Sequence, residues 1–316
     1  MQFFNPEEVK FLTPLWTGER LEDGRPKVPA GVLERLRRLT LEEAWGPIYQ
    51  KGYKYQFEGN LKRTNPDPDY RLVGRAVTAV LMPTRPDLEE LLKRQGLERE
   101  GRRGTFNQWV IDSLVEDDVV VVDFYDKVRD GTFVGGNLST AIRTRTVRGG
   151  AVFWGGIRDM EQIVHIDGLQ IYHRGEDPTA IAEYVMTGMN TPCRIGQAVC
   201  LPGDVVFGTQ SGVLFIPAHL AEAVVVQAEK SHVRDIFGFT RLKQRIYTSA
   251  QIDTAWTLPM MEDFVDWIQK DPAGADYRHL TWDEELEEAR KRRRKHNAGK
   301  DAAHGLEQLE YLRTGD

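Results

Sequence analysis

Two uninterrupted apolar runs limit this chain to a small set of folds. Val119 to Val122 stands between two aspartates, and Ala151 to Trp154 follows a pair of glycines. A run of this kind, without polar alternation, is typical of a strand that is buried on both faces. Between the two runs, Ser139 to Arg145 has a helical character. The sequence therefore predicts an α/β core whose mixed sheet is covered by helices.

Further strands and helices are predicted around this core. Strands are expected over Val73–Met82, Val205–Phe207 and Val213–Ile216. The spacing of apolar residues from Val32 onward indicates one amphipathic helix that runs on through Trp45. Other helices are expected over Asp87–Gln95, His219–Lys230, Met260–Gln269 and Trp282–His296.

Composition excludes several classes of protein. Hydrophobic residues make up 41% of the 316 residues and charged residues 28%, an ordinary balance for a globular protein. The N-terminus has no signal-peptide pattern, and no apolar run reaches the roughly 18 residues of a membrane span. We therefore expect a cytoplasmic protein without membrane contact, in which Cys193 and Cys200 are buried free thiols.

Charge argues against a nucleic-acid partner. The net charge is −6, so no basic field extends over the whole chain. The basic run Arg290 to Lys295 directly follows four glutamates between Glu284 and Glu288, which offset its field. A solvated charged helix explains this pattern better than an RNA-binding segment.

The segment from Gly135 to Asp159 carries the candidate chemistry. Gly135 to Leu138 opens the predicted helix, and Gly155-Gly156 is predicted to turn the chain just before Arg158 and Asp159. Ligand sites in open α/β sheets prefer such positions outside the carboxyl ends of strands. Backbone amides suit an anion, a guanidinium suits a carboxylate, and an aspartate suits Mg²⁺. On an extended turn, Arg158 and Asp159 are expected to point different ways.

Structural explanations of the same residues stay open. Arg158 and Asp159 are also consistent with an ion pair at a surface or between subunits. The glycine pair is also consistent with a flexible turn in which Asn137 is an ordinary helix N-cap. No pair of histidines has the spacing of metal ligands, and only His173, next to Arg174, is a candidate for lining a substrate pocket.

The run GGNLSTAIRTRTVRGGAVFWGGIRDMEQI resembles the RraA-like proteins, a family that includes class II 4-hydroxy-4-methyl-2-oxoglutarate aldolases. The likeness extends upstream to VGRAVTAVLMPTRPDL and downstream to PCRIGQAVCLPGDVVFGTQSGVLFIP. It implies a swivelling β/β/α-type core with a mixed sheet. We accordingly predict an N-terminal extension over residues 1–62, an RraA-like catalytic core over 63–235 and a C-terminal helical extension over 236–316.

The resemblance also implies roles for individual residues. Arg158 would hold the carboxylate of a pyruvate-type substrate, and Asp159 would anchor Mg²⁺ or Mn²⁺. The glycine-rich loop would contact the substrate through its backbone, at Gly135, Gly136, Asn137 and Leu138. Many relatives carry an acid where this chain has Asn137, the third predicted catalytic residue. Because asparagine cannot act as a base near neutral pH, the proton acceptor is expected elsewhere.

The function implied is aldol cleavage of a 4-hydroxy-2-oxo acid to pyruvate and a carbonyl product, dependent on a divalent metal. Oxaloacetate decarboxylation passes through the same enolate. Relatives that regulate ribonuclease can lack the aspartate, so its presence favours chemistry. Two alternatives stay open: a non-enzymatic regulator that binds a protein partner, and a metal-dependent sugar-acid dehydratase or hydratase. The resemblance further implies a homotrimer or a hexamer, with active sites at subunit interfaces.

Overall fold

The protein forms two compact units, Met1–Gln227 and Ala228–Asp316. The computed structural model describes residues 2–295. The predicted division into an N-terminal extension, a core and a C-terminal extension stays a prediction.

The first unit is built on a mixed sheet. Within the described residues this sheet has ten strands, whose main path runs in the order β1-β12-β11-β3-β4-β5-β6-β2. β3, β4, β5 and β6 are parallel to one another, while β8, β11, β12, β1 and β2 are joined in antiparallel fashion. The strands are β1 Phe57–Glu58, β2 Lys62–Arg63, β3 Leu72–Pro83, β4 Asp118–Lys127, β5 Gly150–Ile157, β6 Ile171–His173, β7 Gly175–Glu176, β8 Tyr184–Met189, β11 Val205–Thr209 and β12 Gly212–Ile216. The predicted mixed sheet is thus confirmed.

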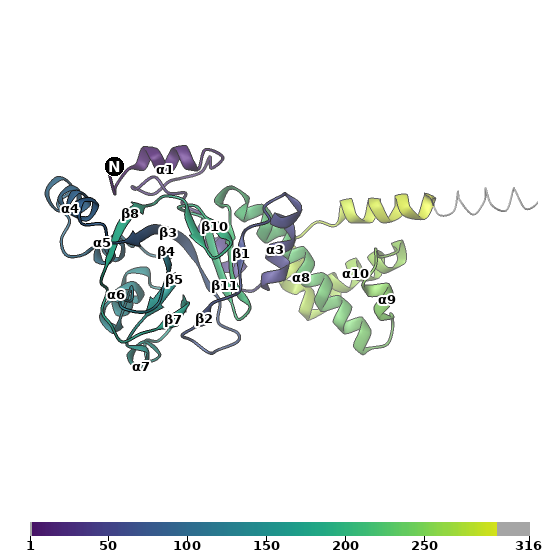
Figure 1. Cartoon of the computed structure of the whole chain (residues 1–316). Coiled ribbons are helices and arrows are strands. Elements are labelled where there is room, and N and C mark those ends of the chain that lie inside the picture. The colour runs from purple at the N-terminus through teal and green to yellow at the C-terminus, as the bar shows by residue number, and fades with distance from the viewer. Residues whose placement is uncertain (1, 296–316) are drawn as a thin grey trace, which may run out of the picture. The chain divides into compact units, whose positions relative to one another are not determined.

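Both faces of the sheet are buried, as the apolar runs predicted. In β4, Val120 and Val122 belong to one core cluster, and Val119 and Val121 belong to a second. Helices α5 and α6 pack on the first face (Figure 1), where α6 contacts both β4 and β5. A small two-stranded sheet, β9 Cys193–Ile195 with β10 Ala198–Cys200, covers the second face. Both cysteines are free and buried.

Helices in the first unit largely follow the predictions. The predicted helices at Asp87–Gln95 and Ser139–Arg145 are present with slightly different ends. The helices are α1 Pro6–Leu12, α2 Ala30–Leu36, α3 Leu41–Gln50, α4 Pro86–Arg94, the π-helix η1 Gln95–Arg99, α5 Phe106–Asp112, α6 Gly136–Thr146, α7 Met160–Ile163 and the 3₁₀ helix η2 Ala218–Leu220.

The helix predicted to run on from Val32 through Trp45 was wrong in its continuity. The first helix ends with α2 at Leu36, and Thr40 is the N-cap of a separate helix, α3, with a capping box. The Thr40 hydroxyl accepts a hydrogen bond from the amide of Glu43, while the Glu43 carboxylate accepts one from the amide of Thr40. These two bonds satisfy amides that a helix start leaves without partners, so a new helix begins at this point.

The N-terminal segment is tied to the sheet by a buried ion pair. Arg25, which is 1% exposed, donates to both carboxylate oxygens of Asp118, at 2.8 and 3.0 Å. Its Nε also bonds Asp23 at 2.6 Å. Burial disfavours the Arg25 charge, but the two carboxylates outweigh this and raise the pKa of the guanidinium. The segment is therefore held at the first residue of β4.

The second unit is helical and has an aromatic core. It contains most of α8 Ala221–Lys243, then α9 Ser249–Ile252, α10 Leu258–Lys270, the 3₁₀ helix η3 Pro272–Tyr277 and a charged helix over 283–295. Phe264 is fully buried and lies 4.6 Å from Trp282 between ring centroids. The end predicted at His296 lies outside the described residues. No helix among residues 2–295 has both the length and the apolarity needed to cross a membrane.

Candidate active site

The candidate site begins where β5 ends. The turn predicted at Gly155-Gly156 was wrong, because both glycines still belong to the strand. A Cβ on Gly155 would lie 2.7 Å from the Phe124 Cβ, and one on Gly156 would lie 2.8 Å from the Val128 carbonyl oxygen. These glycines therefore allow close packing rather than a turn. The chain instead turns at Asp159, whose φ of 58° is left-handed.

Backbone hydrogen bonds place the glycine loop beside this turn. The amide of Phe133 donates to the Gly156 carbonyl at 2.9 Å, and the amide of Arg158 donates to the Val134 carbonyl at 3.0 Å. The buried side chain of Asn107 fixes the loop from behind by donating to the Phe133 carbonyl at 2.9 Å. The loop is therefore bonded directly to the end of β5.

The predicted glycine loop and the predicted Arg-Asp pair come together in space. The amide of Gly136 donates to Asp159 Oδ2 at 3.1 Å. A Cβ on Gly135 would lie 2.2 Å from the same oxygen, and one on Gly136 would lie 2.1 Å from Gln162 Oε1. Neither glycine has a positive φ. An alanine at either position would therefore have to displace a side-chain oxygen, of Asp159 or of Gln162, from its place against the backbone.

Arg158 and Asp159 do not point apart as predicted. Arg158 Nη1 lies 3.3 Å from each oxygen of the Asp159 carboxylate. The left-handed backbone of Asp159 folds its side chain back toward the guanidinium, an arrangement that an extended turn would not give. Both side chains stay partly exposed, at 37% for Arg158 and 27% for Asp159. A contact through one nitrogen at this exposure stabilises by only about 0–1 kcal/mol, so it is easily exchanged for another partner.

The remaining loop residues occupy the first turn of α6. Gly135, not Asn137, is the N-cap, so the alternative that made Asn137 an ordinary cap was wrong. Asn137 is exposed and Leu138 packs partly against the core. Their amides lie in the first turn, where a helix offers its own N–H groups no partners. This turn therefore presents amide donors next to Asp159.

His173 does not line an open pocket. It is fully buried, its Nδ1 lies 3.1 Å from the Gly175 carbonyl oxygen, and burial lowers its pKa. Arg174 instead stacks on the Trp154 ring at 4.3 Å and pairs with Asp126 at 2.8 Å. The prediction for His173 was therefore wrong, because its strand position turns the ring into the core.

The oxygen donors at the turn suit a hard divalent cation. The Asp159 carboxylate is partly exposed, and Gln162 Oε1 lies directly over Gly136. Within residues 2–295 no cluster of three His, Cys, Asp or Glu side chains is arranged to hold a metal. Mg²⁺ needs few protein ligands, because it keeps several waters and binds through one or two carboxylates. The donor set fits an ion of this kind.

Gln162 is the residue of this site that the sequence interpretation missed. It lies three positions after Asp159, in α7. On a helical turn, residues three apart lie on the same side, so the spacing was a usable signal. A single glutamine in a short helix carries a weaker sequence signal than a pair of glycines.

The fold and the site define an α/β protein with an Arg-Asp pair at the carboxyl end of a parallel strand. A model of the RraA-like family, described as Aldolase/RraA, matches residues 42–215. The chain belongs to this family. The match contains the glycine loop, Arg158 and Asp159. A comparison with curated proteins finds no match.

Solved structures share the fold at low sequence identity. An uncharacterized protein from Pseudomonas syringae pv. tomato str. DC3000 is 18% identical with a TM-score of 0.59, covering 72% of this chain and 94% of that chain. Streptomyces coelicolor RraAS2, described as an unusual member of the RNase ES inhibitor RraA protein family, is 22% identical with a TM-score of 0.57, covering 68% and 100%. A protein described among novel cellulases from gut-associated microbes is 19% identical with a TM-score of 0.57, covering 73% and 95%.

Proposed function

We propose that this protein is a divalent-metal-dependent lyase that cleaves a 4-hydroxy-2-oxo acid to pyruvate and a carbonyl compound. One observation carries the proposal: Asp159 Oδ2 lies 3.1 Å from the Gly136 amide, while Arg158 lies 3.3 Å from the same carboxylate. The cluster combines an anion-binding guanidinium, a metal-binding carboxylate and the amides of a helix start. This combination suits an oxo acid.

Arg158 binds and orients the substrate. Its guanidinium leaves the weak contact with Asp159 and binds the 1-carboxylate of the oxo acid. Two parallel N–H···O hydrogen bonds to that carboxylate are stronger than the single-nitrogen contact with Asp159. Asp159, with Gln162 Oε1 beside it, would hold Mg²⁺ or Mn²⁺. When bound, that ion supplies Lewis-acid polarisation of the 2-oxo group.

The loop amides stabilise the charge that develops during cleavage. The 4-hydroxyl loses its proton to a base, and its oxygen becomes the carbonyl oxygen of the released product as the C3–C4 bond breaks. The electron pair of that bond passes into the enolate of pyruvate. The amides of Asn137 and Leu138 donate hydrogen bonds toward the enolate oxygen. Proton transfer to C3 then completes pyruvate. The Asn137 side chain can orient a water by hydrogen bonding, but it cannot accept the hydroxyl proton near neutral pH.

Oxaloacetate decarboxylation is part of the same proposal, because loss of CO₂ from C3 gives the same enolate. The likeness to the family also supports a homotrimer or a hexamer with sites at subunit interfaces. A residue of the neighbouring subunit would then be the proton acceptor that this chain's own loop lacks.

A coupled assay for pyruvate release tests the proposal. Purified protein receives 4-hydroxy-4-methyl-2-oxoglutarate with Mg²⁺, and EDTA is expected to abolish turnover until Mg²⁺ is restored. Asp159→Asn is expected to lower kcat/KM by roughly 100-fold or more, since it removes a charged ligand. Arg158→Ala is expected to raise KM by roughly ten-fold or more through loss of a charge-assisted hydrogen bond.

A second Arg-Asp pair on the same chain provides matched controls. Arg85 and Asp87 are largely exposed and form an ion pair at 2.8 Å, so Asp87→Asn and Arg85→Ala should leave turnover unchanged. The lyase proposal fails if no 4-hydroxy-2-oxo acid releases pyruvate with metal and Asp159→Asn behaves like the wild type. That result would favour the partner-binding regulator. Loss of water without pyruvate would favour the dehydratase.

A further inference from the structure

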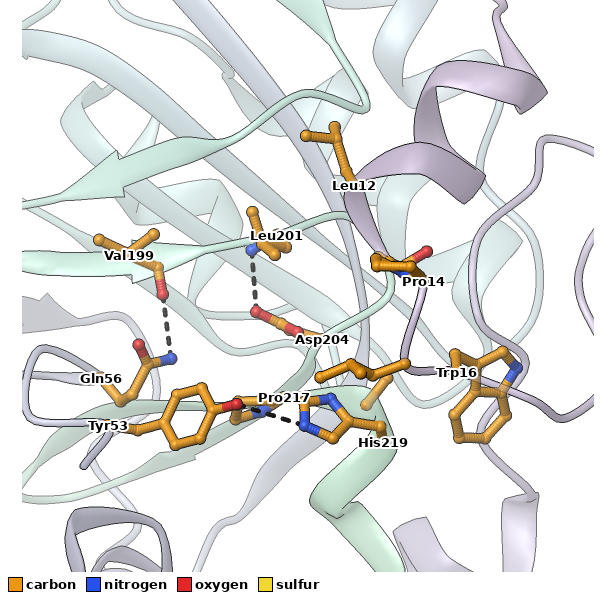
Figure 2. Close-up of a pocket in the computed structure, with 13 residues that line it drawn as sticks. Leu12, Pro14, Trp16, Tyr53, Gln56, Val199, Leu201, Asp204, Pro217 and His219 are labelled. Atoms are coloured by element: carbon orange, nitrogen blue, oxygen red, sulfur yellow. Dashed lines mark hydrogen bonds between the residues drawn. The ribbon is translucent and has the colours of Figure 1, made fainter. Parts of the chain in front are cut away.

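A cavity lies in the first unit, away from the candidate active site. Its volume is about 280 Å³, near the lower end of small-molecule pockets. Figure 2 shows how the segment Leu12 to Trp16 faces Tyr53, Asp204 and His219 across it. Val205, the residue after Asp204, pairs with Arg75 of β3. Arg75 also pairs with Asp118, the first residue of β4. The cavity therefore lies at the amino ends of the parallel strands, whereas Asp159 follows the carboxyl end of β5.

A buried carboxyl group is the main polar feature of this cavity. Asp204 is 5% exposed and accepts the amide of Leu201 at 2.8 Å, with a second backbone contact from Ala218. Burial raises its pKa to about 7. No lysine or arginine is among the described residues that line the cavity. The cavity therefore lacks a side-chain cation to neutralise this carboxylate.

The other polar side chains add acceptors and leave the charge unbalanced. Gln56 Nε2 donates to the carbonyl oxygens of Val199 and Phe215, at 3.1 and 2.7 Å, so its nitrogen is fully used and its Oε1 is left as an acceptor. The Tyr53 hydroxyl lies 3.3 Å from His219 Nε2. Burial lowers the pKa of His219, which keeps its imidazole neutral at pH 7.

Thr13 is the remaining polar residue of the wall, and its hydroxyl is already bonded to the Val9 carbonyl and to Arg20. The rest of the wall is apolar. One side is formed by the N-terminal segment, and the other by β10 and the turn after it. The apolar side chains available to a ligand include Leu12, Pro14, Leu15, Trp16, Val199 and Pro217. A ligand that fills this space must therefore have an apolar body. It must also carry a hydrogen-bond donor, because the polar groups facing it are mainly acceptors.

We propose that this cavity is a second binding site, which takes a small apolar amine. The ammonium group binds the Asp204 carboxylate, and the hydrocarbon or aromatic body packs against Leu12 to Trp16. A 2-oxo acid is excluded, because its own carboxylate would face Asp204 without a cation between them. The site is thus chemically opposite to the Arg158 site, which takes an anion.

The position of the wall makes this site particular to chains with such an N-terminal segment. The match to the RraA-like family begins at residue 42 and ends at 215, so Leu12 to Trp16 and His219 lie outside it. Only part of the cavity, including Tyr53, Gln56 and Asp204, comes from the family core. The inference does not rest on the lyase proposal.

Isothermal titration calorimetry on the full chain tests the inference with three probes of one shape: phenethylamine, 2-phenylethanol and 3-phenylpropionate. Phenethylamine is expected to bind with a Kd of about 0.1–1 mM, the range for so few heavy atoms. The alcohol should bind at least about ten-fold more weakly, and the propionate should give no heat of binding. Equal binding of the three, tighter binding of the propionate, or no phenethylamine binding up to about 10 mM overturns the proposal.

Variants locate the binding. Asp204→Asn should bring the amine and the alcohol to within about three-fold of each other. Because Asp204 is buried, Leu15→Lys provides a second variant at a rim position that is 63% exposed, and it should weaken amine binding. Phe11→Lys is the matched control, since Phe11 is 80% exposed and does not line the cavity. Amine binding that Leu15→Lys leaves unchanged, or that Arg158→Ala abolishes, counts against this site.

The affinity for phenethylamine should also rise between pH 6 and pH 8. The ionised form of Asp204, which binds the ammonium, becomes dominant above its pKa of about 7. Tyr53 and His219 are the other titratable residues that line the cavity, and burial lowers the pKa of His219 from its ordinary value. A flat pH profile contradicts the assignment of Asp204 as the partner of the amine.

Discussion

Gly135 and Gly136 lie in close contact with side-chain oxygens of Asp159 and Gln162, which follow β5 at the other end of the helix-strand segment. Their role is one of space: a Cβ at either position would lie within 2.2 Å of an oxygen atom. The φ angles are ordinary, so the backbone permits an alanine, whose Cβ would push the neighbouring side-chain oxygen aside. Substitution therefore tests the approach of Asp159 with little effect on the chain's conformation.

We expect Gly135→Ala to displace the Asp159 carboxylate from the Gly136 amide. A misplaced ligand should lower kcat/KM for pyruvate release by roughly ten-fold or more, while the melting temperature changes little. Gly31→Ala is the control, because a Cβ at this exposed helical position meets nothing within 4 Å. Full activity in Gly135→Ala would show that the close approach of Asp159 is irrelevant to turnover.

At this scale, the sequence predicted which residues gather but not how they touch. The glycine spacing and the adjacent Arg158 and Asp159 were sufficient to place both ends of the site together. Their mutual contact depends on the left-handed backbone of Asp159, which no local pattern indicated. Burial of His173 and the role of Gln162 likewise depend on neighbours that are distant in the sequence.

Among the elements, the strands were the most predictable and the connections the least. Continuous apolar runs identified β4 and β5, because burial on both faces leaves no polar positions. The break between α2 and α3 was missed, although Thr40 and Glu43 form a short-range capping signal. The ion pair that ties the N-terminal segment to β4 joins residues 93 positions apart, and no periodicity can indicate such a contact.

That ion pair gives a prediction about the N-terminal segment. Arg25→Met should lower the free energy of unfolding by about 3 kcal/mol, because the fully buried Asp118 carboxylate loses its bonds to Arg25 and keeps only the more distant Arg75, at 3.8 Å. Urea denaturation measures the change. Lys27→Met, which removes a charge from an exposed pair with Glu19, should change stability by less than about 1 kcal/mol. Equal effects of the two variants would mean that burial of the pair is unimportant.

On the scale of the whole molecule, the chain has separate cores in its two units. The first unit packs apolar side chains on both faces of the sheet. The second is held by rings, with Phe264 lying 5.2 Å from Phe237 and 5.2 Å from Trp256 between centroids. Separate cores allow the two units to melt separately. From the sequence, the distinct C-terminal part was indicated only by the predicted helical extension over residues 236–316.

Phe264→Ala should therefore affect one melting transition. Loss of a fully buried ring costs about 3–5 kcal/mol, so calorimetry should show the transition of the second unit shifted down while the other stays in place. Phe239→Ala, at a position that is 61% exposed in the same unit, is the control and should shift neither. A uniform shift of a single transition would show that the two cores unfold as one.

The location of the two candidate sites at opposite ends of the parallel strands has a consequence for the history of the chain. The glycine loop, Arg158 and Asp159 lie wholly inside the stretch shared with the family, while one wall of the Asp204 cavity lies before it. Substitutions in residues 12–16 can therefore reshape the cavity without changing any residue of the glycine loop, Arg158 or Asp159. Selection can act on each site separately, so closely related chains can diverge in one ligand while retaining the other.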